Sequence, residues 1–197
     1  MAGMLDGLMQ QLGGGTLQKV GNTLGTDEAT TGSAVSAALP ILMAALARNA
    51  SSPDGANALA TALDRDHDGS ALDNVSSLLD GPQAATAQAS GQKMLGHILG
   101  GGQQHVAGAL GAATGLDAGK ASKLLMILAP MVLAYLGRTK REKGLDAGGL
   151  GSMLGTERAE IGARSGTMGS LLSMLDRDKD GSVVDDLGGM MGKMLGR

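Results

Sequence analysis

Two apolar stretches that each contain a proline set the strongest limit on how this chain can fold. AALPILMAALAR occupies positions 37–48 and ILAPMVLAYLGR occupies positions 127–138, and their prolines, Pro40 and Pro130, are 90 positions apart. Both stretches are apolar nearly all round, which is typical of helices buried on every side. A proline inside a helix removes one backbone hydrogen bond and usually bends the axis. The sequence therefore predicts two related, bent helices packed together centrally.

Other segments recur in the same order. LGGG at 12–15 returns at 99–102, and LDRDHDGS at 63–70 returns as LDRDKDGS at 175–182. This order predicts a first helical repeat over 1–85 and a second over 86–197. The spacing between copies grows from 90 to 112 towards the second aspartate motif, which indicates an insertion near 141–162. The composition of that segment, rich in Gly and charge, favours a loop or a poorly packed extra helix.

The remaining pattern is helical. No alternating run of β-branched residues indicates a strand, and LGGG follows an amphipathic stripe, as a glycine stop does after a helix. With one Tyr, no Phe and no Trp, the core must be built from Leu, Ala, Met and Val, helped by 34 Gly and 13 Met. The predicted fold is all-α, a multihelical array of two duplicated, pseudo-symmetric halves. The apolar stripes at the two ends are Leu5, Leu8, Met9 and Leu12, and Leu187, Met190, Met191, Met194 and Leu195.

The order of these motifs resembles a known family. An N-terminal LxxLMxxLGGG helix, a central LAPMVLAYLGR helix and a closing DRDKDGSVVDDLGGMMGKMLG segment are similar to the YidB-like family of bacterial proteins of unknown function. The resemblance covers most of residues 93–197 and, more weakly, residues 1–85. It implies an all-helical fold, a bacterial source and no established activity.

The two aspartate motifs are the main candidates for chemistry. D-x-D-x-D-G supplies three carboxylates from a short loop, with glycine allowing a sharp turn, and calcium prefers six to eight such oxygen ligands. The Ser and Asp that follow each glycine add further oxygens. We therefore expect two calcium sites. Their predicted ligands are Asp64, Asp66, Asp68, Ser70 and Asp73, and Asp176, Asp178, Asp180, Ser182 and Asp185.

A second interpretation of these motifs stays open. A complete EF-hand loop needs a carboxylate at its twelfth position, where this chain has Val75 in one copy and Leu187 in the other. The Gly-Ser end of each motif has the spacing of a helix N-cap, with an acidic residue three positions after the Ser. Arg65 and His67 could partly neutralise the first aspartates. Capping alone leaves the three alternating carboxylates unexplained, because without a cation they repel one another.

The sequence offers little else that is catalytic. The glycine-rich segments lack the GK[ST] of a phosphate loop, His97 and His105 lie eight apart rather than at zinc-pair spacing, and no Ser stands in a nucleophile elbow. The basic cluster Arg138, Lys140, Arg141 and Lys143 follows an apolar helix, as a solvated helix terminus does. The absence of Cys excludes disulfides and Cys-based zinc sites.

Charge and hydropathy indicate the expected partners and cellular location of the protein. A net charge of −3 provides no basic field for nucleic acid. The N-terminus lacks the features of a secretory signal, and the apolar run at 124–136 is shorter than the roughly 20 residues of a membrane span. We expect a cytoplasmic protein with no transmembrane segment, with export by a non-classical route left open.

Taken together, these patterns predict a non-enzymatic, calcium-binding helical protein that self-associates into a homo-oligomer or filament through faces rich in Met, Leu and Ala. The alternative is a small-molecule carrier or small enzyme with an apolar pocket between the two halves.

Overall fold

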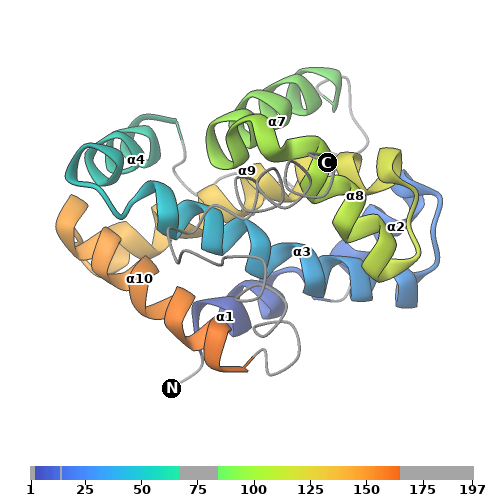
Figure 1. The fold of residues 1–197 in the computed structure, drawn as a ribbon, viewed down its shortest axis with the longest axis horizontal. Coiled ribbons are helices and arrows are strands. Elements are labelled where there is room, and N and C mark those ends of the chain that lie inside the picture. Colours follow the sequence, from blue (N-terminus) through green and yellow to red (C-terminus); the bar gives the residue numbers. More distant parts are fainter. Residues whose placement is uncertain (1–2, 14, 67–83, 165–197) are drawn as a thin grey trace, which may run out of the picture. The chain divides into compact units, whose positions relative to one another are not determined.

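The structure, a computed structural model, describes residues 3–13, 15–66 and 84–164, and within them it confirms the all-α prediction (Figure 1). Every regular element in these ranges is helical and none is a strand. The first part of the chain forms α1 (Met4–Gln11), α2 (Gly15–Leu24), α3 (Glu28–Asn49) and α4 (Pro53–Asp66). The later part forms α7 (Ala84–Leu99), a 3-10 turn (Gly100–Gly102), α8 (Gln103–Thr114), α9 (Ala118–Glu142) and α10 (Ala147–Arg164).

The two proline-containing helices, α3 and α9, form the centre, as predicted. They contact each other, and α9 also packs against α2, α4, α7 and α8. Leu39 and Leu42 of α3 and Leu124 and Leu128 of α9 are completely buried. Each such leucine contributes about 1.5–3 kcal/mol by leaving water, so the core needs no aromatic side chain.

The proline of α9 has a visible effect on packing. Since Pro130 has no N–H, the carbonyl of Met126 lacks the donor that a helix normally supplies four residues later. Gly91 of α7 lies directly against this carbonyl, in a space that a Cβ atom would overlap. A glycine at position 91 is therefore required for the close approach of α7 to α9.

Helices α3 and α9 begin in the same way. Gly25 and Gly115 precede them with φ values of 65° and 76°, a left-handed conformation that costs glycine little. Two residues later Asp27 and Asp117 are the N-caps, and each accepts a backbone hydrogen bond of 2.8 Å from the residue three positions on. Such a cap typically stabilises a helix by about 1 kcal/mol. The glycine and aspartate pairs share the spacing of 90 found for the prolines, which agrees with a duplication; the duplication itself stays a prediction.

The N-terminal stripe is covered in part within the chain, and its residues Leu5 and Met9 remain partly exposed. Leu8 and Leu12 are buried, with exposed fractions of 0% and 2%, and α1 contacts α3. The expected glycine stop is also found, because α1 ends before Gly13 and α7 ends before Gly100.

The segment near 141–162 contains an extra helix, one of the two predicted alternatives, but this helix is well packed rather than poorly packed. The segment contains the end of α9 and most of α10, and Leu150 and Leu154 of α10 are completely buried. Their i, i+4 spacing gives α10 one apolar stripe, which the many glycines around it obscured. The chain divides into two compact units, Met1–Glu157 and Arg158–Arg197. These units describe how the chain packs, whereas the repeats 1–85 and 86–197 describe a sequence duplication. The repeats therefore stay a prediction.

Two helices, α3 and α9, are long and apolar enough to cross a membrane by length and composition alone. In the structure, 44% of the apolar window of α3 and 61% of that of α9 are buried against other helices. The central helix of a packed domain meets the same criteria, so these numbers do not by themselves indicate a membrane span.

Candidate functional site

The first aspartate motif begins in the last turn of α4. Ser52 accepts a hydrogen bond from the Gly55 backbone N–H at the start of this helix, and Pro53 is its first residue, a position that suits proline. The helix then continues through Asp66. Asp64, the first predicted ligand, therefore stands at the C-terminal end of a helix rather than in a loop.

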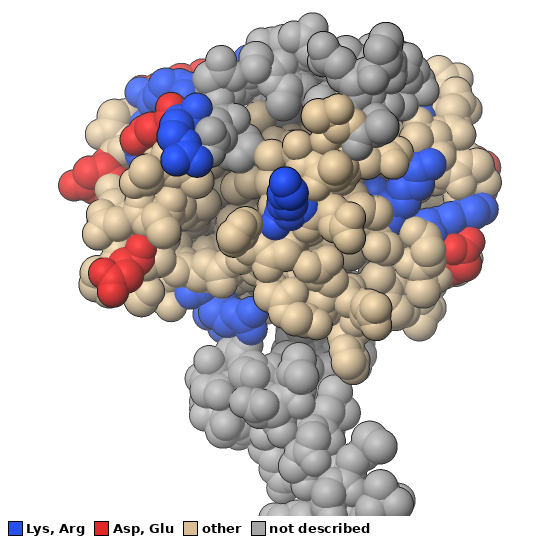
Figure 2. Space-filling model, turned by 90° about the horizontal axis from the view of Figure 1, so that it is seen from above, with Lys and Arg blue, Asp and Glu red and all other residues tan. Residues whose placement is uncertain are grey.

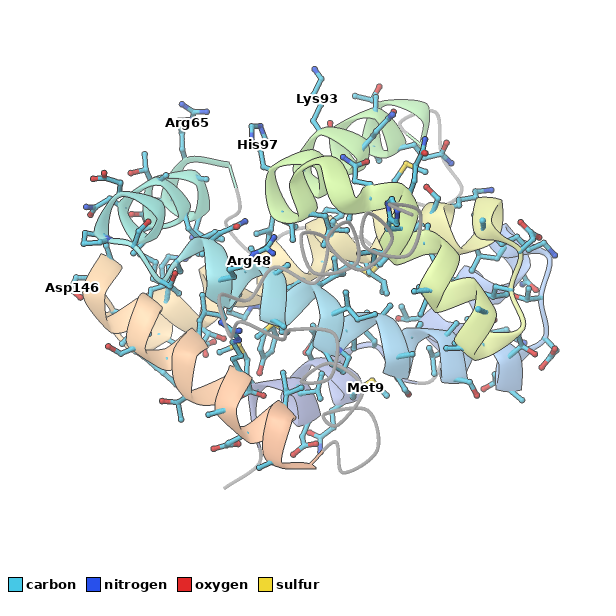
Figure 3. The ribbon with its side chains drawn as sticks, viewed as in Figure 1. Met9, Arg48, Arg65, Lys93, His97 and Asp146 are labelled. Carbon is cyan, nitrogen blue, oxygen red and sulfur yellow. The ribbon has the colours of Figure 1, made fainter. Side chains whose placement is uncertain are left out.

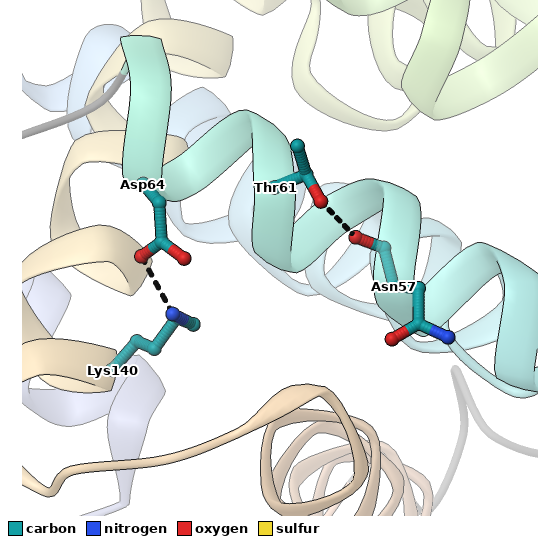
Figure 4. Close-up of polar contacts among 4 residues, drawn as sticks. All are labelled: Asn57, Thr61, Asp64 and Lys140. Carbon is teal, nitrogen blue, oxygen red and sulfur yellow. Dashed lines mark hydrogen bonds and ion pairs between the residues drawn. The ribbon is translucent and has the colours of Figure 1, made fainter.

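Asp64 binds a positive charge from a distant part of the chain. The Nζ atom of Lys140, in α9, lies 2.6 Å from Oδ1 of Asp64 (Figure 4). The side chain of Lys140 is 11% exposed and that of Asp64 is 56% exposed. The pair therefore joins a shielded ammonium group to a carboxylate that solvent reaches freely, and it ties the end of α4 to α9.

The other predicted ligands are described only in part. Asp66 is the last residue of α4, but its side chain is outside the described part of the chain. The remaining predicted ligands lie outside the described residues: Asp68, Ser70 and Asp73, and Asp176, Asp178, Asp180, Ser182 and Asp185.

The basic cluster after the second apolar stretch is only partly the solvated terminus that the sequence predicted. Arg141 and Lys143 are exposed at the end of α9, but Lys140 is largely buried and paired with Asp64. The two partners are 76 positions apart, so no local pattern could reveal the contact. Arg65, which was expected near the aspartates, is exposed and points away from the helices in Figure 3.

The structure also reveals a buried acidic residue that sequence reasoning missed. Glu157 of α10 is 7% exposed, and its two carboxylate oxygens accept hydrogen bonds from the backbone N–H groups of Met4 (3.0 Å) and Leu5 (2.8 Å). Helix N-termini have unpaired N–H groups and a partial positive charge. Glu157 therefore caps α1 from the far end of the unit. Because both oxygens are occupied by backbone donors, this carboxylate has a structural role.

The only tyrosine of the chain lies next to this cap. The hydroxyl of Tyr135 occupies the space where a Cβ atom on Gly7 of α1 would stand. Burial raises the pKa of Tyr135, the charges of Glu157 and Glu142 raise it further, and a hydrogen bond with Thr139 acts in the opposite direction. A tyrosine with a raised pKa stays protonated at neutral pH. The contact between Tyr135 and Gly7 holds α1 against α9, and the protonated Tyr135 hydroxyl is not an activated nucleophile.

Within the part of the chain that the structure describes, histidines and surface charge add no second candidate site. His97 and His105 are exposed on α7 and α8, and His97 and Lys93 point outward in Figure 3. Among residues 3–13, 15–66 and 84–164, no group of three or more His, Cys, Asp or Glu side chains could hold a metal ion. On the face shown in Figure 2, the coloured Lys and Arg side chains are dispersed among uncharged residues.

These features define the class: an all-helical protein with two central proline-containing helices and a helix end that presents a carboxylate to solvent. The chain belongs to DUF937, a family described as bacterial protein of unknown function, whose model matches residues 6–139. The match extends from α1 through most of α9 and includes both apolar stretches. No curated protein and no solved structure shows significant similarity to the chain.

Proposed function

We propose that the protein is a non-enzymatic, calcium-binding helical protein that self-associates. The observation that supports calcium binding is the Asp64–Lys140 pair: the first carboxylate of the D-x-D-x-D-G motif is more than half exposed and already holds a positive charge. A position that stabilises an ammonium group also suits a metal cation, provided that further oxygen ligands are within reach. The chain supplies these at Asp66, the last residue of α4, and shortly after it in the sequence, at Asp68, Ser70 and Asp73.

Calcium is preferred over magnesium because the motif offers many carboxylate oxygens close together. Magnesium keeps most of its water and takes one or two carboxylates, whereas calcium accepts six to eight oxygen ligands. The second motif, from Asp176 to Asp185, is followed by Asp186 where the first has Asn74. Its additional charge is expected to give the tighter site.

Self-association is proposed through the C-terminal stripe. Leu8 and Leu12 of the N-terminal stripe are buried within their own unit, and only Leu5 and Met9 remain partly exposed, so this stripe offers little apolar surface to a second molecule. The stripe at Leu187, Met190 and Met194 remains the candidate. Related but non-identical faces favour head-to-tail contacts, which build filaments. We also propose that the chain is a YidB-like protein, because it carries the LxxLMxxLGGG, LAPMVLAYLGR and DRDKDGSVVDDLGGMMGKMLG segments in that family's order.

Isothermal calorimetry tests the calcium sites. We expect heat of binding at or below millimolar calcium for the intact chain, and a loss of the tighter phase in Asp176→Ala/Asp178→Ala. No heat at millimolar calcium would refute the proposal.

Light scattering with calcium and with chelator tests self-association separately. We expect a mass above that of one chain in at least one condition, reduced by Met190→Glu/Met194→Glu. A monomer under both conditions would exclude this part of the proposal.

A further inference from the structure

We infer that two copies of this protein associate by exchanging α1, so that the socket of each copy receives the first helix of the other. The socket is the surface that holds α1, formed by α3, by Tyr135 of α9 and by Glu157 of α10. This exchange rests on the proposed self-association and gives it a contact that does not use the C-terminal stripe.

The polar part of the socket requires the start of a helix. Glu157 is only 7% exposed, and its carboxylate oxygens accept hydrogen bonds of 3.0 and 2.8 Å from the backbone N–H groups of Met4 and Leu5. A socket without a helix leaves this carboxylate buried without those donors, which is costly. An apolar surface alone therefore cannot fill the socket.

The shape of the socket selects the sequence of α1. The Tyr135 hydroxyl occupies the space where a Cβ atom on Gly7 would stand, so the bound helix needs a glycine one turn after its start. Leu8 and Leu12 complete the fit, with exposed fractions of 0% and 2%. A second copy of the chain offers the same helix with the same residues, and for this reason we assign the second copy as the partner.

The connection between α1 and α2 favours exchange. Only residues 12–14 separate the two helices, and positions 12–15 read LGGG. Short hinges favour exchange between copies, and glycine adopts the backbone angles of more than one arrangement at little cost. The contacts at Tyr135 and Glu157 are the same whether α1 comes from its own chain or from the other. Exchange therefore costs little beyond bringing two chains together.

Exchange of both helices gives a closed assembly. Each copy donates one α1 and receives one, so both sockets are filled and the contact has two-fold symmetry. The expected product is a dimer. The head-to-tail contact proposed for the C-terminal stripe instead adds copies without closing, so the size of the assembly distinguishes the two contacts.

Hinge variants test the exchange. All chains carry Met190→Glu/Met194→Glu, which removes the proposed contact at the C-terminal stripe. Deleting Gly13 and Gly14 leaves α1 too little chain to fold back into its own socket. The dimer fraction, measured by size-exclusion chromatography with light scattering, should then rise about threefold or more. Inserting Gly-Ser-Gly-Ser after Gly14 should lower the dimer fraction by a similar factor.

A mixture of two complementary variants, in the same background, identifies the contact itself. Gly7→Ala places a methyl group against the Tyr135 hydroxyl, and Tyr135→Phe in the other chain removes that hydroxyl. In an exchanged heterodimer, the altered α1 meets the altered socket, and the second contact is wild type. The Gly7→Ala homodimer keeps both clashes. Native mass spectrometry with one isotope-labelled chain should show the heterodimer in excess of the statistical ratio by about fivefold or more.

Gly15→Ala is the matched control for Gly7→Ala. A Cβ atom at Gly15, the first residue of α2, meets no atom of the described part of the chain within 4 Å. Its mixture with the Tyr135→Phe chain should therefore give the statistical ratio.

The outcomes separate exchange from the contact at the C-terminal stripe. If the background chain and its hinge deletion are both monomers, α1 is not exchanged. The same conclusion follows if the heterodimer appears only at the statistical ratio, or if the Gly15→Ala control gives an equal excess. A wild-type assembly larger than that of the background chain supports the stripe whatever the hinge variants show. If both chains form the same dimer, the stripe contact fails and the exchange stands.

Discussion

Glu157 offers the sharpest test of how α1 is held. Replacing Glu157 with Ala removes the acceptor for the N–H groups of Met4 and Leu5, which lie 3.0 and 2.8 Å from its carboxylate. Hydrogen bonds to a charged group each contribute about 1.5–3 kcal/mol. Taking the lower value for each bond gives a loss of about 3 kcal/mol. Melting of a chain of this size should then occur about 6–12 °C lower.

Thermal unfolding followed by circular dichroism measures this loss, and hydrogen exchange localises it. Glu157→Gln keeps one acceptor oxygen and should lose less stability than Glu157→Ala. Glu142→Ala removes the same charge from an exposed position and should change the free energy of unfolding by less than about 0.5 kcal/mol. The amides of Met4 and Leu5 should exchange faster in Glu157→Ala. A loss below about 1 kcal/mol, or an equal loss in the Glu142 variant, would refute the assignment of Glu157 as a remote cap.

Three further predictions concern the contacts between helices. Gly7→Ala should cost about 1–3 kcal/mol by overpacking against the Tyr135 hydroxyl, and the cost measured by urea unfolding should shrink in a Tyr135→Phe background. Because the raised pKa of Tyr135 comes mainly from burial, its ultraviolet titration should have a midpoint above the ordinary value, and higher still in Thr139→Val. The stability that comes from the buried, protonated Tyr135 is present below the pKa of the unfolded state and is lost as pH rises through the pKa of the folded state. A titration midpoint at the ordinary value would contradict the burial of Tyr135. Leu128→Ala, at a completely buried position of α9, should cost about 2–5 kcal/mol, and an unchanged urea midpoint would show that α9 is not central.

Much of the fold follows from local pattern. The two proline-containing stretches, the LGGG stops and the stripe at Leu8 and Leu12 depend on hydrophobic periodicity and on glycine, which act within a few residues. These features predicted an all-α chain with two central helices, and the structure confirms both. The segment near 141–162 contains the extra helix that was one of the two alternatives, but the expected poor packing was wrong, because this helix buries Leu150 and Leu154.

For the candidate site, too, some features follow from the sequence and others follow only from the tertiary structure. The sequence by itself determined the aspartates and their spacing, since the proposed metal-binding motif consists of neighbouring residues. Only the tertiary structure decided that Asp64 faces Lys140 and that Glu157 caps α1, because these partners are 76 and more than 150 positions apart. Which charges meet depends on the packing of α4 against α9 and of α1 within its unit. A distant pair of this kind leaves no periodic signal, and it forms only once the apolar helices have buried their shared core.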